Sequence, residues 1–174
     1  MSYTELFKIT KTGNVKKFDE VHNSWRGAMS IWRILEERYL PSLPSPNWLK
    51  ESEPRYYSRC GFDGDMSEIW KLPFSTKMTE IENIVMLSTF DWVIVNRSNI
   101  LKIINAFREF DGETSLKEQA DLIETLYKKD KKFIGICWNQ TSINGDTWKD
   151  SDWKPYNVLR NNKHWELFSE LEKK

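Results

Sequence analysis

The thiols of Cys60 and Cys137 and the imidazoles of His22 and His164 are the side chains of this sequence that could serve as a nucleophile or a base. A thiol enzyme needs a thiolate with an imidazole beside it, so Cys60 and His22 would form an active site only if the fold brought them together. Single cysteines and histidines of this kind are more often structural. We therefore predict no catalytic residue.

The sequence also lacks the motifs that would indicate a metal or cofactor site. Asp63 and Asp65 flank Gly64, but the positions that follow do not continue a calcium-binding loop. The sequence has no glycine-rich phosphate loop, no dinucleotide-binding fingerprint, no His-Glu-x-x-His and no cysteine or histidine spacing suited to zinc. We expect neither a metal nor a cofactor.

Polar side chains are concentrated between two tryptophans in residues 137–148, CWNQTSINGDTW. The Asn-Gly pair at 144–145 predicts a type I′ turn, because both central positions of that turn need positive φ. A rigid turn presents side chains well, so Asn139, Gln140 and Asp146 are candidate recognition residues. The alternative is that the segment is only a hairpin tip, since Asn, Asp and Ser are common in turns.

Basic side chains supply the other candidate contacts. Lys or Arg near an RNA backbone can bind phosphate, and a guanidinium can stack on an unpaired base. The candidates are Lys128, Lys129, Lys131, Lys132, Arg26 and Arg33. The lysine run also suits a helix C-terminus without any partner. Trp25 and Trp32 fall on the apolar stripe of their helix and are predicted to lie in the core.

Charge and composition exclude several function classes. Lys plus Arg and Asp plus Glu both number 26, which gives zero net charge, and the pI is about 6.8. A uniformly basic nucleic-acid coat and an acidic mimic of DNA are both excluded. Apolar residues make up 39% of the 174 residues and aromatic residues 14%, which is enough for one folded domain with an aromatic core.

The chain shows no sign of export or membrane insertion. Its N-terminal sequence, MSYTELFKIT, lacks the basic and apolar blocks of a signal peptide, and the cysteines form no Cys-x-x-Cys pair. No run approaches the length of a membrane span. We expect a cytoplasmic protein with reduced cysteines and no membrane contact.

Hydrophobic periodicity predicts the elements that position these residues. The predicted elements are a hairpin at 3–9 and 15–21, a helix at 24–40, a helical turn at 66–71, a helix or a strand at 79–88, a strand at 90–95, a helix capped by Ser98 that closes at 111–112, a helix opened by a capping box at Ser115 and Glu118, a strand at 133–136 and a helix at 163–171. Residues 41–65 hold four prolines and two glycines and are predicted to be a long aromatic loop, either a lid on the core or a functional segment. The fold class is α+β, a single compact domain over 1–174, with antiparallel β-hairpins packed with four to five helices.

Six blocks of the sequence carry a family resemblance. They are YTELF at 3–7, SWRGAMSIWRILEERYLP at 24–41, STFDWVIV at 88–95, AFREFDGETSLKEQADLIETLY at 106–127, WNQTSINGDTW at 138–148 and HWELF at 164–168. As an ordered series they resemble a family of small phage and prophage proteins of Gram-positive bacteria. The resemblance spans most of the chain except residues 41–65.

The resemblance implies an accessory protein without a catalytic motif, which counters host defence in the cytoplasm of the bacterial host cell. The implied activity is non-enzymatic inhibition of a type II-A CRISPR effector, with Cas9 and its guide RNA as partners and residues 41–65 as the source of specificity. Because net charge is zero, we do not expect DNA mimicry at the protospacer-adjacent motif site. Two alternatives are a phage structural or assembly module and a small enzyme acting on a nucleotide or a nucleic acid.

Overall fold

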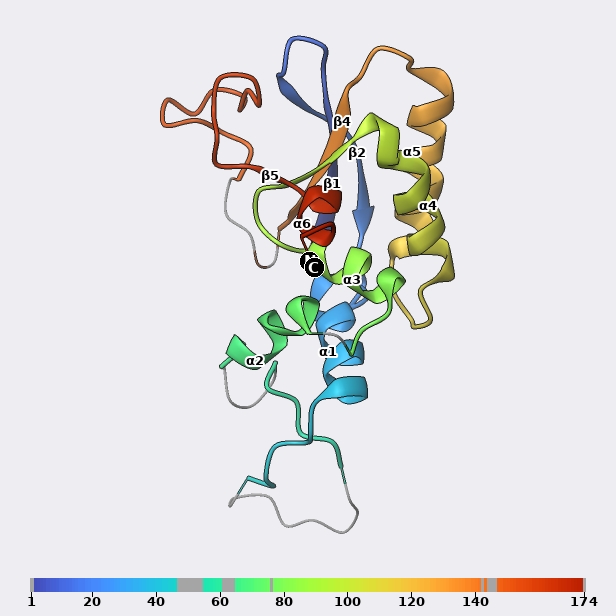
Figure 1. The fold of residues 1–174 in the computed structure, drawn as a ribbon, viewed down its shortest axis with the longest axis vertical. Helices are drawn as coiled ribbons and strands as arrows, with labels where there is room; N and C mark the ends of the chain where they lie inside the picture. Colours follow the sequence, from blue (N-terminus) through green and yellow to red (C-terminus); the bar gives the residue numbers. More distant parts are fainter. Residues whose placement is uncertain are drawn as a thin grey trace.

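A mixed five-stranded β-sheet organises the chain in the computed structural model (Figure 1). The structure describes residues 2–46, 55–60, 65–75, 77–141, 143 and 147–173. Within these residues the strands are β1 (Tyr3–Ile9), β2 (Val15–His22), β3 (Val93–Asn96), β4 (Gly135–Gln140) and β5 (Trp165–Glu166). Their order is β2-β1-β4-β3-β5, with β3 and β5 parallel and the other neighbours antiparallel.

The predicted N-terminal hairpin is confirmed. β1 and β2 pair antiparallel, from Tyr3 opposite His22 to Ile9 opposite Val15. Gly13 lies in the turn with φ of 83°, a left-handed conformation that glycine adopts without steric cost. β4 pairs with the other side of β1, so this hairpin forms one edge of the sheet and joins it to the second half of the chain.

Helices surround one face and one end of the sheet. In the described part of the chain they are α1 (Ala28–Tyr39), α2 (Ser67–Trp70), α3 (Glu80–Leu87), α4 (Ile100–Glu109), α5 (Leu116–Lys129) and α6 (Leu167–Leu171), with 3₁₀ turns at Leu72–Phe74 and Arg97–Asn99. α4 packs along α5, and α1 contacts both α2 and α3 (Figure 1). The predicted α+β class is confirmed. None of these helices is both long and apolar enough to cross a membrane.

Both faces of the sheet are covered, which is why every residue of β4 is buried. Leu6, Ile136 and Trp138 belong to the main core between the sheet and the helices. Cys137 faces the opposite way and packs with Tyr156 in a smaller cluster. The segment that carries Tyr156 lies on the side of the sheet away from α4 and α5 (Figure 1). Burial on both faces explains the continuous apolar pattern of this strand.

Helix α1 begins later than the predicted start at Ser24. Ser24 and Trp25 have φ of 45° and 68°, outside the right-handed helical region. A turn closed by the bond from Arg26 N–H to the Asn23 carbonyl at 2.7 Å takes up these residues. Trp25 is consequently 96% exposed, so its predicted place in the core is wrong, whereas Trp32 is 6% exposed as predicted.

The predicted C-terminal helix also begins later, at Leu167. Trp165 and Glu166 pair with β3 as a short parallel strand instead. The main-chain N–H of Trp165 donates to the Trp92 carbonyl at 3.0 Å, so the sheet satisfies a donor that a helical turn would have left unpaired. Sequence periodicity does not reveal a two-residue strand of this kind.

Helix α5 does not use the capping box that the sequence predicts. Ser115 is the N-cap residue, but its hydroxyl contacts Asn23 Oδ1 at 3.3 Å and accepts from Gln119 Nε2 at 3.1 Å. Glu118 pairs with Arg26 at 2.8 Å rather than with the N-cap backbone. Long-range polar partners therefore replace the local cap.

Helix α3 begins with a complete capping box. Thr79 accepts from Glu82 N–H, and the Glu82 carboxylate accepts from Thr79 N–H. Glu82 also accepts from Arg38 Nη1 at 2.9 Å and from the Tyr39 hydroxyl, which joins α3 to the end of α1. The helix alternative for residues 79–88 is confirmed.

The segment at 41–65 is a loop in its described parts. Residues 41–46, 55–60 and 65 include no helix and no strand. Tyr57 is 4% exposed and packs into the molecule. The turn predicted near Trp48 lies outside the described residues.

Candidate functional site

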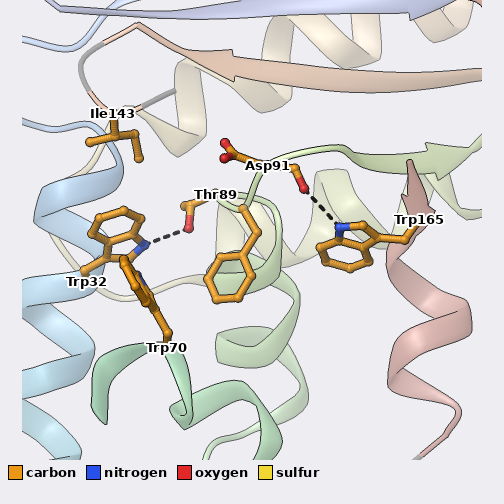
Figure 2. Close-up of a pocket in the computed structure, with 7 residues that line it drawn as sticks. Trp32, Trp70, Thr89, Asp91, Ile143 and Trp165 are labelled. Atoms are coloured by element: carbon orange, nitrogen blue, oxygen red, sulfur yellow. Dashed lines mark hydrogen bonds between the residues drawn. The ribbon is translucent and has the colours of Figure 1, made fainter. Parts of the chain in front are cut away.

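An aromatic pocket of about 490 Å³ opens where the loop before β3 meets α1, α2 and β5 (Figure 2). The lining residues are Trp32, Trp70, Thr89, Phe90, Asp91, Ile143 and Trp165. Figure 2 shows Trp32 and Trp70 on one side of this pocket and Trp165 on the other, with Asp91 between them. The described lining thus combines three indoles and a phenyl ring with one carboxylate and one hydroxyl. We call this site the tryptophan pocket.

Helices α1 and α2 build one wall of the tryptophan pocket. Trp32 lies on the inward face of α1 and is only 6% exposed, whereas Trp70, the last residue of α2, is 49% exposed. α2 is four residues long and leads into the 3₁₀ turn that contains Pro73. Because proline cannot continue a helix, the chain turns away directly after Trp70 and leaves the indole accessible.

The loop between α3 and β3 supplies the polar atoms of the pocket. Thr89 Oγ1 accepts from Trp32 Nε1 at 2.7 Å and donates to the Met86 carbonyl at 2.6 Å. The carbonyl of Asp91 accepts from Trp165 Nε1 at 2.9 Å (Figure 2). The Asp91 side chain is exposed, and its carboxylate lies away from Trp165 (Figure 2). The indole N–H groups of Trp32 and Trp165 are therefore used within the protein.

A strained turn holds Asp91 in place. The next residue, Trp92, has φ of 61°, a conformation that is rare for a bulky side chain and costs energy. Its ring packs 5.5 Å from Trp148 and 5.1 Å from Tyr156, between ring centroids, on the other face of the sheet. These contacts hold the turn and thereby fix the backbone of Asp91 at the edge of the pocket.

Arg59 connects α1 and α2, the two helices that form one wall of the tryptophan pocket, through two ion pairs. Glu36, one helical turn after Trp32 on α1, is 0% exposed and accepts from Arg59 Nη1 at 3.1 Å. Arg59 is also nearly buried, and its Nε donates to Glu68 of α2 at 2.7 Å. We call this set, Glu36, Arg59 and Glu68, the ion triad. It links α1 to α2 two residues before Trp70.

Hydrogen bonds keep the buried Glu36 carboxylate charged. Burial alone raises the pKa of Glu36, but hydrogen bonds from the Arg59 N–H, the Ser58 hydroxyl and the Arg59 guanidinium outweigh it, so the pKa lies below its ordinary value. The same carboxylate acts on its neighbours. Burial, followed by the charge of Glu36, raises the pKa of Tyr56 to about 12.

Two polar side chains, Thr89 and Asp91, are present among the described residues that line the tryptophan pocket. The Thr89 hydroxyl already has both a donor and an acceptor partner, so it is not available as an activated nucleophile. A general base needs a reacting partner held beside it, and the described lining residues include one titratable group, Asp91.

The thiols and imidazoles lie elsewhere, and the structure does not pair them. Cys137 is fully buried, which raises its pKa well above the ordinary value. Burial also raises the pKa of Cys60, and the nearby Glu36 carboxylate adds to this effect. His22 Nδ1 contacts the Ser24 hydroxyl, and its ring lies against Tyr3 rather than against a thiol.

Metal ligands do not converge in the part of the chain that the structure describes. No group of three or more His, Cys, Asp or Glu side chains is placed there to hold an ion. Asp65 Oδ1 accepts from the Ser67 N–H at 2.9 Å, as in an ordinary turn before a helix. Asp63 lies outside the described residues.

The two predicted arginine contacts are paired with acidic side chains. Arg26 Nη1 lies 2.8 Å from Glu118, and Arg33 Nε lies 3.7 Å from Glu37. Arg33 is the more exposed of the two, with 63% of its side chain accessible. Both remain at the surface, but neither lines the tryptophan pocket.

The predicted lysine contacts lie at the C-terminal end of α5. All four are exposed: Lys128, Lys129, Lys131 and Lys132. Lys128 pairs with Glu124 at 3.0 Å, and Lys131 Nζ donates to the Tyr127 carbonyl at 3.3 Å, contacts that suit the negative end of a helix. Arg26 contacts Glu118 near the other end of α5, which at 1.5 Å per residue places it roughly 15 Å from this cluster. The basic candidates therefore do not form one patch.

Asn139 and Gln140 are strand residues rather than surface residues of a turn. Both belong to β4 and are 8% and 4% exposed. Asn139 Nδ2 donates to Glu5 at 2.8 Å, and Gln140 Oε1 accepts from the Thr4 hydroxyl at 2.7 Å. The expectation that they are exposed is wrong, because β4 continues for two residues beyond its apolar run and pairs with β1 there. Asp146 and the Asn-Gly pair lie outside the described residues.

Sequence reasoning missed Trp70, Asp91, Trp165 and Arg59. Each comes from a different segment, and none has a neighbour in sequence that marks it as functional. One sequence signal was available: the predicted helical turn at 66–71 is too short to bury its tryptophan on a helical face. Comparison of the chain with protein-family models, with curated proteins and with solved structures gave no match.

Proposed function

We propose that this protein acts by binding a macromolecular partner through the tryptophan pocket, without catalysing a reaction. The observation that carries the proposal is the exposed indole of Trp70, 49% accessible beside a cavity of about 490 Å³. Tryptophans in such positions are frequent anchors of protein interfaces, because they remove a large apolar area from water on binding. The partner that the family resemblance favours is a host defence effector, a type II-A Cas9.

Contact with the effector protein is favoured over contact with its guide RNA. Three of the basic candidates, Arg26, Arg33 and Lys128, already contact acidic side chains of this protein. Among the described residues that line the pocket there is no Lys or Arg that could bind a phosphate backbone. A protein surface with an apolar anchor needs neither a free basic side chain nor a phosphate contact.

A target-cleavage assay tests the proposal. Purified protein is added to Cas9 before or after guide loading, and both the target DNA and the guide RNA are resolved on denaturing gels. We expect cleavage to fall while the guide stays intact. Full cleavage at excess protein would refute the choice of Cas9, and a shortened guide would refute a non-enzymatic mechanism.

Two matched variants assign the contact surface. Trp70→Ala removes the accessible wall of the pocket, and Trp153→Ala removes another exposed indole, 70% accessible, that is not part of the pocket. We expect Trp70→Ala to lose inhibition at least tenfold in half-maximal concentration, since truncation of an anchor costs about 2 kcal/mol or more. Trp153→Ala should inhibit as the unchanged protein does. Equal inhibition by both variants would exclude the tryptophan pocket as the contact.

A further inference from the structure

The start of helix α1 opens into a second cavity, of about 450 Å³. Residues 27–30, which are the N-cap and the first turn of this helix, line the cavity, and so do Trp25, Arg33 and Tyr56. We call this cavity the α1 pocket. Its volume lies in the range of sites that hold a small-molecule ligand.

This end of α1 is uncapped and carries partial positive charge. The N-cap residue is Gly27, no side chain caps the helix in the described part of the chain, and the first turn holds no acidic residue. The N–H groups of a first turn have no acceptor within their own helix, and the helix dipole adds to their charge. A helix start of this kind attracts an anion such as phosphate.

A buried donor without a partner lies at the same place. Asn23 is 1% exposed, and its Oδ1 accepts from the Thr4 hydroxyl at 2.9 Å. Its Nδ2 has no acceptor among the described residues, and a Cβ on Gly27 would come within 2.6 Å of it. The Asn23 amide thus reaches the N-cap of α1 with its N–H groups unpaired. A negative charge held there would offset the cost of leaving these donors unsatisfied.

Two exposed side chains of the pocket suit a ligand that is both anionic and aromatic. The Arg33 side chain is 63% exposed, and its pair with Glu37 is 3.7 Å long and open to water, so Glu37 competes weakly with a bound anion. Trp25 is 96% exposed and has φ of 68°, a strained conformation for a bulky side chain. Strain of this kind is concentrated at functional sites. An indole held in water in this way is a stacking platform for a planar ring.

We infer that the α1 pocket binds a nucleotide, an inference that goes beyond the proposed function and does not depend on it. The phosphate lies at the start of α1, within reach of Arg33, and the base stacks on the Trp25 indole. A carboxylate side chain of a protein would bring the charge without a ring, and an aromatic side chain would bring a ring without the charge. A nucleotide carries both, whether it is free or forms the 5′ end of an RNA.

NMR titrations of the isolated protein test this inference. The probes are inorganic phosphate, adenosine and adenosine 5′-monophosphate (AMP). Binding is followed by the N–H signals of the Ala28 and Met29 main chain and of the Trp25 indole. We expect phosphate to shift the two main-chain signals, adenosine to shift the indole signal, and AMP to shift all three. AMP should bind roughly fivefold or more tightly than either part, as base stacking predicts.

Three variants assign the contacts. Arg33→Met should weaken the binding of phosphate and of AMP by roughly threefold or more and leave adenosine binding unchanged. Trp25→Gly should reduce the affinity for AMP to that for phosphate. Because glycine adopts the positive φ of this position without steric cost, such a loss would not reflect unfolding. Trp153→Ala, which removes an exposed indole outside the α1 pocket, should bind AMP as the unchanged protein does.

Equal affinity for AMP and inorganic phosphate, or equal AMP affinity of Trp25→Gly and the unchanged protein, would overturn the assignment. Main-chain signals of Ala28 and Met29 that do not move with phosphate would overturn it as well. A 5′-phosphorylated RNA hexamer separates the two sources of the nucleotide. Tighter binding than AMP would uphold the site with an RNA end as ligand, and equal or weaker binding would uphold it with a free nucleotide. Failure to inhibit Cas9 would refute only the choice of effector, because these probes bind the isolated protein.

Discussion

Replacement of Arg59 by methionine tests whether the ion triad stabilises the fold. Arg59 Nη1 lies 3.1 Å from Glu36, whose side chain is 0% exposed, and 2.9 Å from the Pro41 carbonyl. Its Nε lies 2.7 Å from Glu68. Methionine keeps most of the apolar stem but removes the charge, so Glu36 would remain buried without its cationic partner.

The expected cost is large for a single substitution. Removal of one partner from a buried ion pair typically costs about 3–5 kcal/mol, because the other charge stays desolvated. Glu36 keeps two donors, the Ser58 hydroxyl and the Arg59 main-chain N–H. We therefore place the loss near the lower limit, at about 3 kcal/mol, which corresponds to a fall in Tm of roughly 6–12 °C for a domain of this size.

Urea denaturation with a matched surface variant measures this loss. Arg33→Met breaks the pair with Glu37, in which the side chains are 63% and 44% exposed at 3.7 Å, and should cost less than about 1 kcal/mol. Both variants should unfold with the slope of the unchanged protein, so that a lower midpoint reports stability alone. A midpoint for Arg59→Met within error of that for Arg33→Met would refute the reasoning.

Three further predictions concern other elements. Trp25→Gly should raise the free energy of unfolding by about 0.5–1 kcal/mol in urea denaturation, because Trp25 has φ of 68°, which glycine adopts without steric cost, and its side chain is 96% exposed. A lower free energy of unfolding would show that the Trp25 indole stabilises the fold. Thr79→Ala removes half of the α3 capping box and should lower the free energy of unfolding by about 1 kcal/mol in the same assay. An unchanged midpoint would mean that Arg38 and Tyr39 are sufficient to hold Glu82 without the Thr79 side chain. Burial raises the pKa of Glu36 and of Glu82, but their hydrogen bonds outweigh it and leave both below the ordinary 4.5, so the stability they contribute is present above that pH and is lost as pH falls below it. Urea midpoints that match at pH 7 and pH 3.5 would contradict this.

Local patterns predicted the elements whose stabilising contacts are also local. The hairpin around Gly13 and the helices α4 and α5 follow from alternation, periodicity and turn residues over a few positions. Ser115 and Glu118 show where such reasoning fails. They match a capping box, but Asn23 and Arg26 from the other half of the chain bind them instead. The competing interaction was tertiary and therefore absent from any short window.

The tryptophan pocket could not be predicted for the same reason. Trp32 was correctly placed in the core, yet one edge of it faces a cavity that exists only because α2, the loop before β3 and β5 meet there. Trp25 shows the opposite error, since it fits the helical stripe but precedes the helix. A tryptophan's type and spacing predict that it packs against something, whereas only the fold decides whether the partner is the protein itself or a ligand.

A double variant of the ion triad can distinguish its effect on stability from its effect on the position of Trp70. A double variant, Glu36→Leu with Arg59→Met, leaves no buried charge, and apolar replacements of buried ion pairs are often neutral or stabilising. We therefore expect it to recover most of the stability that Arg59→Met loses. Apolar side chains do not supply the directional bond from Arg59 to Glu68 that sets α2 against α1, so the position of Trp70 should be less well defined.

Inhibition by the double variant should then stay weaker than that of the unchanged protein although its urea midpoint recovers. This outcome would make Arg59 a positioning residue for the tryptophan pocket, because a purely structural role predicts that binding and stability return together. Full recovery of both would show that α2 holds Trp70 in place without the ion triad. In that case packing around Ile69, which is 0% exposed, would be what orients the wall of the pocket.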